Sequence, residues 1–276
     1  MNLQERLAAD QVVFTAWSGV PDALTVEIMA LQGFDAVTLD MQHGGHHEDS
    51  VLRSVVPVRH AGKHAIVRIP VGRFDMASRA LDFGAEAVIA PMVNSVADAR
   101  LFAESMKYPP VGGRSWGPTF GFARMGGTSQ MDWLRSMNTA TVSFAMIETR
   151  SALEDLDGIL ATPGIDAIFL GPSDFSIAWT NGAAINPTLE DMMEAVSDIA
   201  ARARKAGKYA GIFVMDAAYT GRYVEMGYRF LALGNEQRCM ALGAEALITG
   251  ARESIAGRKV DGVDADPYAS ASRSGS

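Results

Sequence analysis

Eight short apolar runs alternate with longer stretches of helical periodicity along this chain, and this alternation constrains the fold more than any other feature. The expected strands are residues 12–18, 36–42, 65–70, 87–93, 141–148, 167–172, 209–215 and 229–234. The expected helices are residues 21–33, 47–61, 75–84, 96–106, 151–162, 188–206, 216–227 and 236–250. Each run is nearly continuous in apolar residues, which predicts parallel strands covered on both faces. Eight such units predict an α/β fold, a (β/α)8 barrel, which typically takes about 250 residues.

Two segments lie outside this repeat. Residues 107–140 form a long connection rich in Gly, Arg and aromatic residues, and such connections are usually functional or interfacial. Residues 257–276 are small and polar, and we expect them to be a disordered tail or a remnant of expression. A single barrel domain is therefore expected over residues 1–256.

Composition excludes several other classes of protein. The net charge of −8 argues against a nucleic-acid-binding surface, which needs clustered Lys and Arg. No apolar stretch approaches the roughly 20 residues of a membrane helix, and the start shows no secretory signal. No GxGxxG motif follows a strand, which weakens a dinucleotide-binding interpretation. The single cysteine, Cys239, excludes an intramolecular disulfide framework and fits the cytoplasm.

Polar residues follow the expected strands at their C-terminal ends, where the active site of such a barrel lies. They are Trp17, Ser18, Asp40, Gln42, His43, Arg68, Asn94, Glu148, Ser173, Asp174, Asn235 and Glu236. This set combines carboxylates with a histidine and an arginine, which is the composition of a metal site beside a proton-transfer group.

Glu148 and Asp174 follow neighbouring strands, and each has a structural alternative. Glu148 could form an ion pair with Arg150 or another arginine, since an unpaired buried charge is costly. Asp174, expected in a tight GPSD turn, could instead cap the next helix. Together the two carboxylates indicate a hard divalent cation such as Mg²⁺ or Mn²⁺.

His43 follows Asp40 by three residues, and histidine is the usual proton acceptor near neutral pH. Arg68 could stabilise a developing oxyanion, or it could pair structurally with Asp40. We expect His46 and His47 to open the next helix on the surface.

The positions of the lysines argue against a Schiff-base mechanism, which needs a lysine that projects into the mouth of the barrel. The five lysines are Lys63, Lys107, Lys205, Lys208 and Lys259. Three lie just before strands, and the other two lie in the long connection and in the tail. Carbon–carbon bond chemistry beside a carbonyl would therefore need a metal as its electron sink.

Several motifs in fixed order resemble the HpcH/HpaI aldolase and citrate lyase β-subunit family over residues 10–250. They are FDAVTLDMQHG, VVPVRHAGKHAIVRIP, ALDFGAEAVIAPMVNSVADA, YPPVGGRSWGP, FAMIET and IDAIFLGPSDFS. The likeness is greatest to the short, class II members that cleave 4-hydroxy-2-oxoacids, such as 4-hydroxy-2-oxoheptanedioate or 2-dehydro-3-deoxyglucarate. This resemblance implies a cytoplasmic, metal-dependent lyase that yields pyruvate or hydroxypyruvate and an aldehyde.

The resemblance also implies roles for particular residues and a mode of assembly. The metal (Mg²⁺, Mn²⁺ or Co²⁺) would be held by Glu148 and Asp174. Proton transfer would fall to His43 paired with Asp40, and Arg68 would steady the enolate oxygen. The remaining implied substrate-binding residues are Gly171, Pro172, Ser173 and Trp17. The family is commonly a hexamer, a trimer of dimers, in which the last helix packs on a neighbouring subunit.

One position departs from the family, and two other functions remain open. Many members have glutamine two residues before the metal-binding glutamate, where this chain has Met146. An acyl-CoA lyase of the same family would need a basic surface for the nucleotide phosphates, which the acidic pI of about 5.1 does not support. A catalytically silent barrel used for binding would be expected to have lost the His–Arg–Glu–Asp set, which is present.

Overall fold

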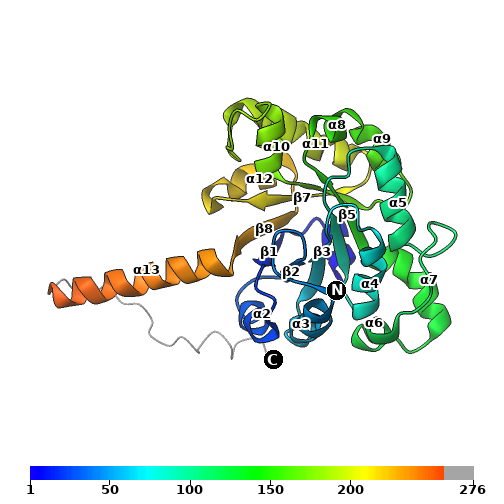
Figure 1. The fold of residues 1–276 in the computed structure, drawn as a ribbon, viewed down its shortest axis with the longest axis horizontal. Coiled ribbons are helices and arrows are strands. Elements are labelled where there is room, and N and C mark those ends of the chain that lie inside the picture. Colours follow the sequence, from blue (N-terminus) through cyan, green and yellow to red (C-terminus); the bar gives the residue numbers. More distant parts are fainter. Residues whose placement is uncertain (258–276) are drawn as a thin grey trace.

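The structure, a computed structural model, describes residues 1–257 and contains the predicted closed barrel of eight parallel strands (Figure 1). The strands are β1 (Val13–Ser18), β2 (Ala36–Asp40), β3 (His64–Arg68), β4 (Ala87–Ala90), β5 (Val142–Ile147), β6 (Ala167–Leu170), β7 (Tyr209–Val214) and β8 (Phe230–Asn235). Each strand pairs with the next one in sequence, and β8 closes the ring on β1. The expected tail, apart from Gly257, lies outside the described residues.

Each expected helix is present, some of them divided, and all but the last lie in the layer around the strands. They are α2 (Ala23–Ala30), α3 (Glu48–His60), α4 (Asp75–Phe83), α5 (Val96–Met106), α8 (Arg150–Glu154) with α9 (Leu156–Ala161), η1 (Glu190–Met192) with α11 (Met193–Lys205), η2 (Ala217–Tyr219) with α12 (Thr220–Met226), and α13 (Glu236–Ile255). The helix expected at 151–162 is thus two helices that meet at Asp155. None of the helices in residues 1–257 is long and apolar enough to cross a lipid bilayer.

Four helices were not expected from the sequence. They are α1 (Leu3–Ala8), α6 (Thr119–Arg124), α7 (Gln130–Ala140) and α10 (Pro172–Trp179). The long connection at 107–140 is therefore partly helical, and GPSD begins a helix rather than a tight turn. Gly171 and Pro172 place the start of α10 directly at the end of β6, because proline favours the first position of a helix.

Two apolar layers hold the barrel together. The interior is filled by side chains such as Ile66, Phe144, Phe169 and Phe230, with the rings of Phe144 and Phe230 4.8 Å apart. Leu3 and Leu7 of α1 belong to the same cluster. A larger cluster packs the outward faces of the strands against the helices. The interior is thus solid, and open space remains at the ends of the strands.

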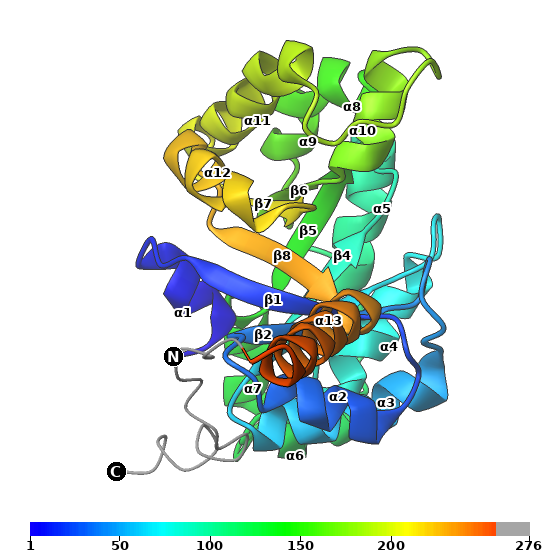
Figure 2. The same cartoon turned by 90° about the vertical axis from the view of Figure 1, so that its left-hand side faces the viewer.

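Helix α13 departs from this plan. It leaves the end of β8 and projects away from the barrel as an arm, which the turned view shows nearly end-on (Figures 1 and 2). Glu236, its first residue, is its only buried residue.

Candidate active site

The C-terminal ends of the strands surround a cavity of about 170 Å³. Its lining residues are Trp17, His43, Arg68, Met146, Glu148, Phe169, Gly171, Pro172, Ser173, Asp174, Phe213 and Met215. Eight of the nine residues predicted for the site are among them, and the ninth, Asp40, lies directly behind Arg68 and Trp17.

Glu148 follows β5 immediately and is 3 % exposed. Its carboxylate accepts a hydrogen bond of 3.0 Å from the backbone N–H of Met92 and makes none with Arg150, which binds carbonyl oxygens of α10 instead. Burial raises the pKa of Glu148 to about 7; the Met92 hydrogen bond lowers it, the neighbouring Asp174 adds to the rise and Arg68 opposes it. The negative charge of this buried carboxylate is compensated by only one backbone hydrogen bond and the charge of Arg68, so the site is suited to binding a cation.

Asp174 lies in the first turn of α10 and does not cap it, because Gly171 occupies the N-cap position. A side chain at position 171 would meet Glu148, since a Cβ there would lie 2.4 Å from its Oε1. The glycine therefore lets the start of α10 approach Glu148 closely. This approach brings the second carboxylate to the same cavity.

The two carboxylates fit a divalent cation that keeps part of its water shell. In residues 1–257 no three His, Cys, Asp or Glu side chains gather into a metal site made of protein ligands alone. Mg²⁺ usually binds one or two carboxylates and retains waters that a substrate oxygen can replace. The donor set of Glu148 and Asp174 is of this kind.

Asp40 is paired with Arg68 rather than with the His43 side chain. The guanidinium donates from Nε to Oδ1 at 2.8 Å and from Nη2 to Oδ2 at 2.6 Å, and Trp17 Nε1 donates to Oδ2 at 3.2 Å. His43 reaches Asp40 only through its backbone N–H, at 3.4 Å. The expected pairing of the His43 and Asp40 side chains is therefore wrong in this structure, and Asp40 pairs with Arg68, whose guanidinium still lines the cavity.

This pairing fixes the orientation of Arg68 at the cavity wall. Both charged partners are buried, and Arg68 lowers the pKa of Asp40 against the opposing effect of burial. The guanidinium also lies over the Trp17 ring, 4.9 Å from its centre. A bidentate, stacked arginine is held in one geometry. Asp40 is thus a support for Arg68, while the exposed side chain of His43 borders the cavity from the loop after β2.

The cavity also has an apolar lining. Trp17 packs against Phe169 and Phe213, with ring centres 5.6 and 5.2 Å apart, and the buried Met146 and the exposed Met215 also line the cavity. Met146 adds no hydrogen-bonding group where a glutamine would. Phe213 and Met215 were not among the predicted site residues, although both fall at the end of the predicted seventh strand.

Met92 is a third residue of the site that the sequence did not reveal. Its φ of 53° is unusual for a residue with a side chain, and its backbone N–H binds Glu148. His46 was expected on the surface but is 4 % exposed, so that expectation was wrong.

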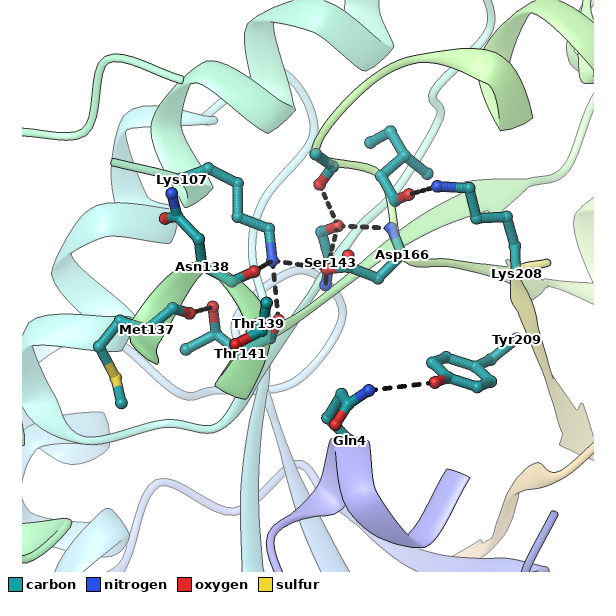
Figure 3. A network of polar contacts seen from close by, with 12 residues as sticks. Gln4, Lys107, Met137, Asn138, Thr139, Thr141, Ser143, Asp166, Lys208 and Tyr209 are labelled. Carbon is teal, nitrogen blue, oxygen red and sulfur yellow. Dashed lines mark hydrogen bonds and ion pairs between the residues drawn. The ribbon is translucent and has the colours of Figure 1, made fainter. Parts of the chain in front are cut away.

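None of the lysines within residues 1–257 lines the cavity. Lys107 is buried at the N-terminal end of the barrel, where Nζ binds the carbonyl oxygens of Asn138 and Thr141 at 2.8 Å and Asp166 at 2.7 Å (Figure 3). Lys208 binds the Ile165 carbonyl oxygen in the same region. Lys259 lies outside the described residues.

Comparison with known sequences finds one family over most of the chain. The HpcH/HpaI aldolase/citrate lyase family matches residues 14–241. A hydroxypyruvate/pyruvate aldolase of Roseovarius nubinhibens is 33 % identical over 83 % of this chain and 88 % of its own length. A 4-hydroxy-2-oxo-heptane-1,7-dioate aldolase of Klebsiella pneumoniae is 31 % identical over 88 % of this chain and 91 % of its own.

Comparison of folds finds the same relationship. The crystal structure of an HpcH/HpaI aldolase from Desulfitobacterium hafniense superposes with a TM-score of 0.82 and 28 % sequence identity. The match covers 92 % of this chain and 97 % of that one. Sequence and fold therefore agree over the whole barrel.

Proposed function

The chain belongs to the HpcH/HpaI aldolase/citrate lyase family, and from this we propose that it is a class II, metal-dependent lyase of 4-hydroxy-2-oxoacids. The reaction is a reversible aldol cleavage that gives pyruvate or hydroxypyruvate and an aldehyde. The observation that carries this proposal is the buried Glu148, which shares one cavity with Asp174, Arg68 and His43.

Glu148 and Asp174 would hold the divalent cation, Mg²⁺, Mn²⁺ or Co²⁺. When bound, the cation supplies the electron sink for the oxoacid carbonyl, which lysine supplies in Schiff-base aldolases. The backbone N–H groups of Ser173 and Asp174 point out of the N-terminus of α10, because the first turn of a helix leaves such groups without partners. They would receive the oxoacid carboxylate. Gly171 and Pro172, which has no N–H to donate, would border it.

The other polar residues would act on protons and charge. His43 borders the cavity and is free to move a proton at the carbon that becomes the nucleophile, or at the aldol hydroxyl. Arg68, held by Asp40, would stabilise the oxygen on which negative charge develops. Trp17 would border the substrate, and its Nε1 donates to Oδ2 of Asp40 beside Arg68. Asp40 therefore acts through Arg68 in this proposal.

We also propose that the protein assembles through its arm. The exposed apolar residues of α13 include Met240, Leu247 and Ile248, at 73, 77 and 51 % exposure. A groove of about 670 Å³ lies between α2, α3 and α6, with Leu24, Val56 and Phe120 in its lining. The α13 helix of a second copy supplies the apolar face that this groove lacks, and repetition of this contact in a trimer of dimers gives a hexamer.

The single exposed cysteine, Cys239, fits a reducing compartment, and we place the enzyme in the cytoplasm.

The proposed function is tested by exchange of the pyruvate methyl protons in D₂O, followed by NMR. The chelated enzyme should not exchange them, and Mg²⁺, Mn²⁺ or Co²⁺ should restore exchange. His43→Ala should slow exchange by about 10²- to 10⁴-fold, as expected for loss of a general base, while pyruvate binding changes little. Absence of exchange with all three metals and with both pyruvate and hydroxypyruvate would refute the proposal.

A further inference from the structure

A buried carboxylate begins the arm helix but does not serve that helix. Glu236 is 6 % exposed, and the N-cap of α13 is Asn235. The Glu236 carboxylate accepts a hydrogen bond of 2.6 Å from the Ser18 hydroxyl and one of 3.0 Å from the Gly19 N–H. The N–H of Val20 adds a third, at 3.2 Å. Glu236 is therefore bonded to the end of β1 and the loop that follows it.

The same contacts continue to the loop after β2. Ser18 Oγ lies 2.9 Å from His46 Nε2, and His46 Nδ1 lies 3.0 Å from Ser50 Oγ in the first turn of α3. Ser18, His46 and Ser50 are all buried. A continuous buried chain of hydrogen bonds thus joins the start of α13, through the end of β1, to the α3 end of the β2–α3 loop.

Backbone contacts hold these two loops together as well. The Gly45 N–H donates to the Gly19 carbonyl oxygen at 2.7 Å, and the His46 N–H donates to the Asp40 carbonyl oxygen at 3.3 Å. A Cβ on Gly44 would lie 2.5 Å from the Asp40 carbonyl oxygen, so the loop passes too close for a side chain there. His43 sits in the middle of this clamped loop.

The chemistry of Glu236 indicates a role beyond packing. Among the ion pairs of residues 1–257, none involves Glu236, so its buried charge is compensated by one hydroxyl and two N–H groups. Replacing a hydrogen-bonded buried pair by apolar groups of the same shape is often nearly neutral for stability. Apolar groups could fill the same space, but they would not make the three directional hydrogen bonds by which the Glu236 carboxylate fixes the geometry of the loop after β1.

We propose that Glu236 is a positioning residue of the active site, which acts through Ser18 and His46 on the loop that carries His43. Because Glu236 is also the first residue of α13, the arm and the proton-transfer residue share one support. The inference rests on the proposed function, in which His43 moves the proton of the oxoacid.

The test measures pyruvate methyl exchange in the metal-loaded, full-length protein with Glu236→Gln, Ser18→Ala and the double variant. Each single substitution should lower the exchange rate by about tenfold to a hundredfold, since small misplacements of a reacting group cost this much, while the KM for pyruvate stays within about twofold. The double variant should lose no more than about twofold beyond the slower single one, because both act along one chain. Glu245→Gln, an exposed carboxylate on the same helix, should match the wild type.

The outcomes separate this inference from the proposed function. Wild-type protein that exchanges neither pyruvate nor hydroxypyruvate with any of the three metals refutes the proposed function and the inference with it. Wild-type exchange with unchanged rates in Glu236→Gln and Ser18→Ala overturns the inference alone, even if melting temperatures fall. Fully additive losses overturn it too, because they mean that the residues act independently. Circular dichroism verifies folding, and if Glu236→Gln does not fold, the Ser18→Ala rate decides the question.

Discussion

At the residue scale, the most informative group is Glu148, whose carboxyl is buried and has a pKa of about 7. In the unfolded chain it ionises near 4.5, so the folded protein binds an extra proton between these two pH values. The carboxyl therefore contributes stability below pH 4.5, and this contribution is lost as the pH rises through 7. The free-energy cost of burying the ionised Glu148 carboxylate is offset only when a cation is bound beside it.

Glu148→Gln should accordingly stabilise the chelated protein at pH 8 while it abolishes metal binding. We expect the free energy of unfolding at pH 8 to rise by about 2–3 kcal/mol and the difference from the wild type to shrink toward pH 4.5. Denaturant titration measures the first effect, and calorimetric titration with Mn²⁺ measures the second. A variant that still binds Mn²⁺ with wild-type affinity would remove Glu148 from the metal site.

His46 provides a second pH effect of opposite sign. Burial lowers its pKa to about 4, although Glu236 and Asp40 oppose this. The unfolded chain takes up the proton near pH 6.5 and the folded protein only near pH 4, so stability is lost as the pH falls through this range.

His46→Gln should therefore flatten the loss of stability between pH 6.5 and 4, by up to about 2–3 kcal/mol over the range. The free energy of unfolding at several pH values gives the slope directly. His60→Gln is the matched control, because it removes an exposed histidine from α3. Equal slopes in the wild type and His46→Gln would contradict the prediction.

At the scale of elements, strands and helices could be predicted from the sequence where their apolar patterns were long. All eight strands could be predicted, because strands covered on both faces are continuous in Val, Ile, Ala and Phe. Helices α6 and α7 could not, since their segment is interrupted by Gly and Pro and each is stabilised by neighbours distant in sequence. One example is Arg124, which ends α6 and donates to the Leu52 and Phe83 carbonyl oxygens.

The same division applies to the candidate site. Residues at strand ends could be placed from the barrel rule alone, which brought Glu148, Asp174 and Arg68 to one cavity. The hydrogen-bond partners of these side chains could not be predicted, because Asp40 lies within reach of both Arg68 and the loop that carries His43. The surroundings of His46 likewise include Glu236, which lies 190 residues further along the chain and is linked to His46 through Ser18.

Lys107 stabilises the long connection as an element. Its ammonium binds the carbonyl oxygens of Asn138 and Thr141 at the far end of that connection, and Asp166 before β6 (Figure 3). Lys107→Met removes the charge and leaves these acceptors unpaired, which should lower the free energy of unfolding by about 3 kcal/mol. Lys205→Met, at an exposed position, should not. Thermal unfolding distinguishes the two, and pyruvate exchange per folded molecule should be unchanged in both, because Lys107 lies far from the cavity.

At the scale of the whole molecule, the arm helix α13 is the element whose apolar side chains are exposed to solvent in a single chain. Met240, Ala244, Leu247, Ile248 and Ile255 recur at helical spacing and form one apolar face of α13. Exposed apolar patches of this kind mark association surfaces. The groove between α2, α3 and α6 presents apolar side chains of its own. A barrel with both features is complementary to copies of itself.

Leu247→Asp tests this complementarity. The wild type should elute as an oligomer in size-exclusion chromatography with light scattering, with a mass near six times 29.5 kDa for the proposed hexamer. An aspartate in the middle of the apolar face should reduce that mass, because association would bury its charge without a partner. Thr249→Asp adds the same charge to the opposite face of the helix and should leave the mass unchanged. A monomeric wild type, or equal masses for the two variants, would show that the arm does not mediate assembly.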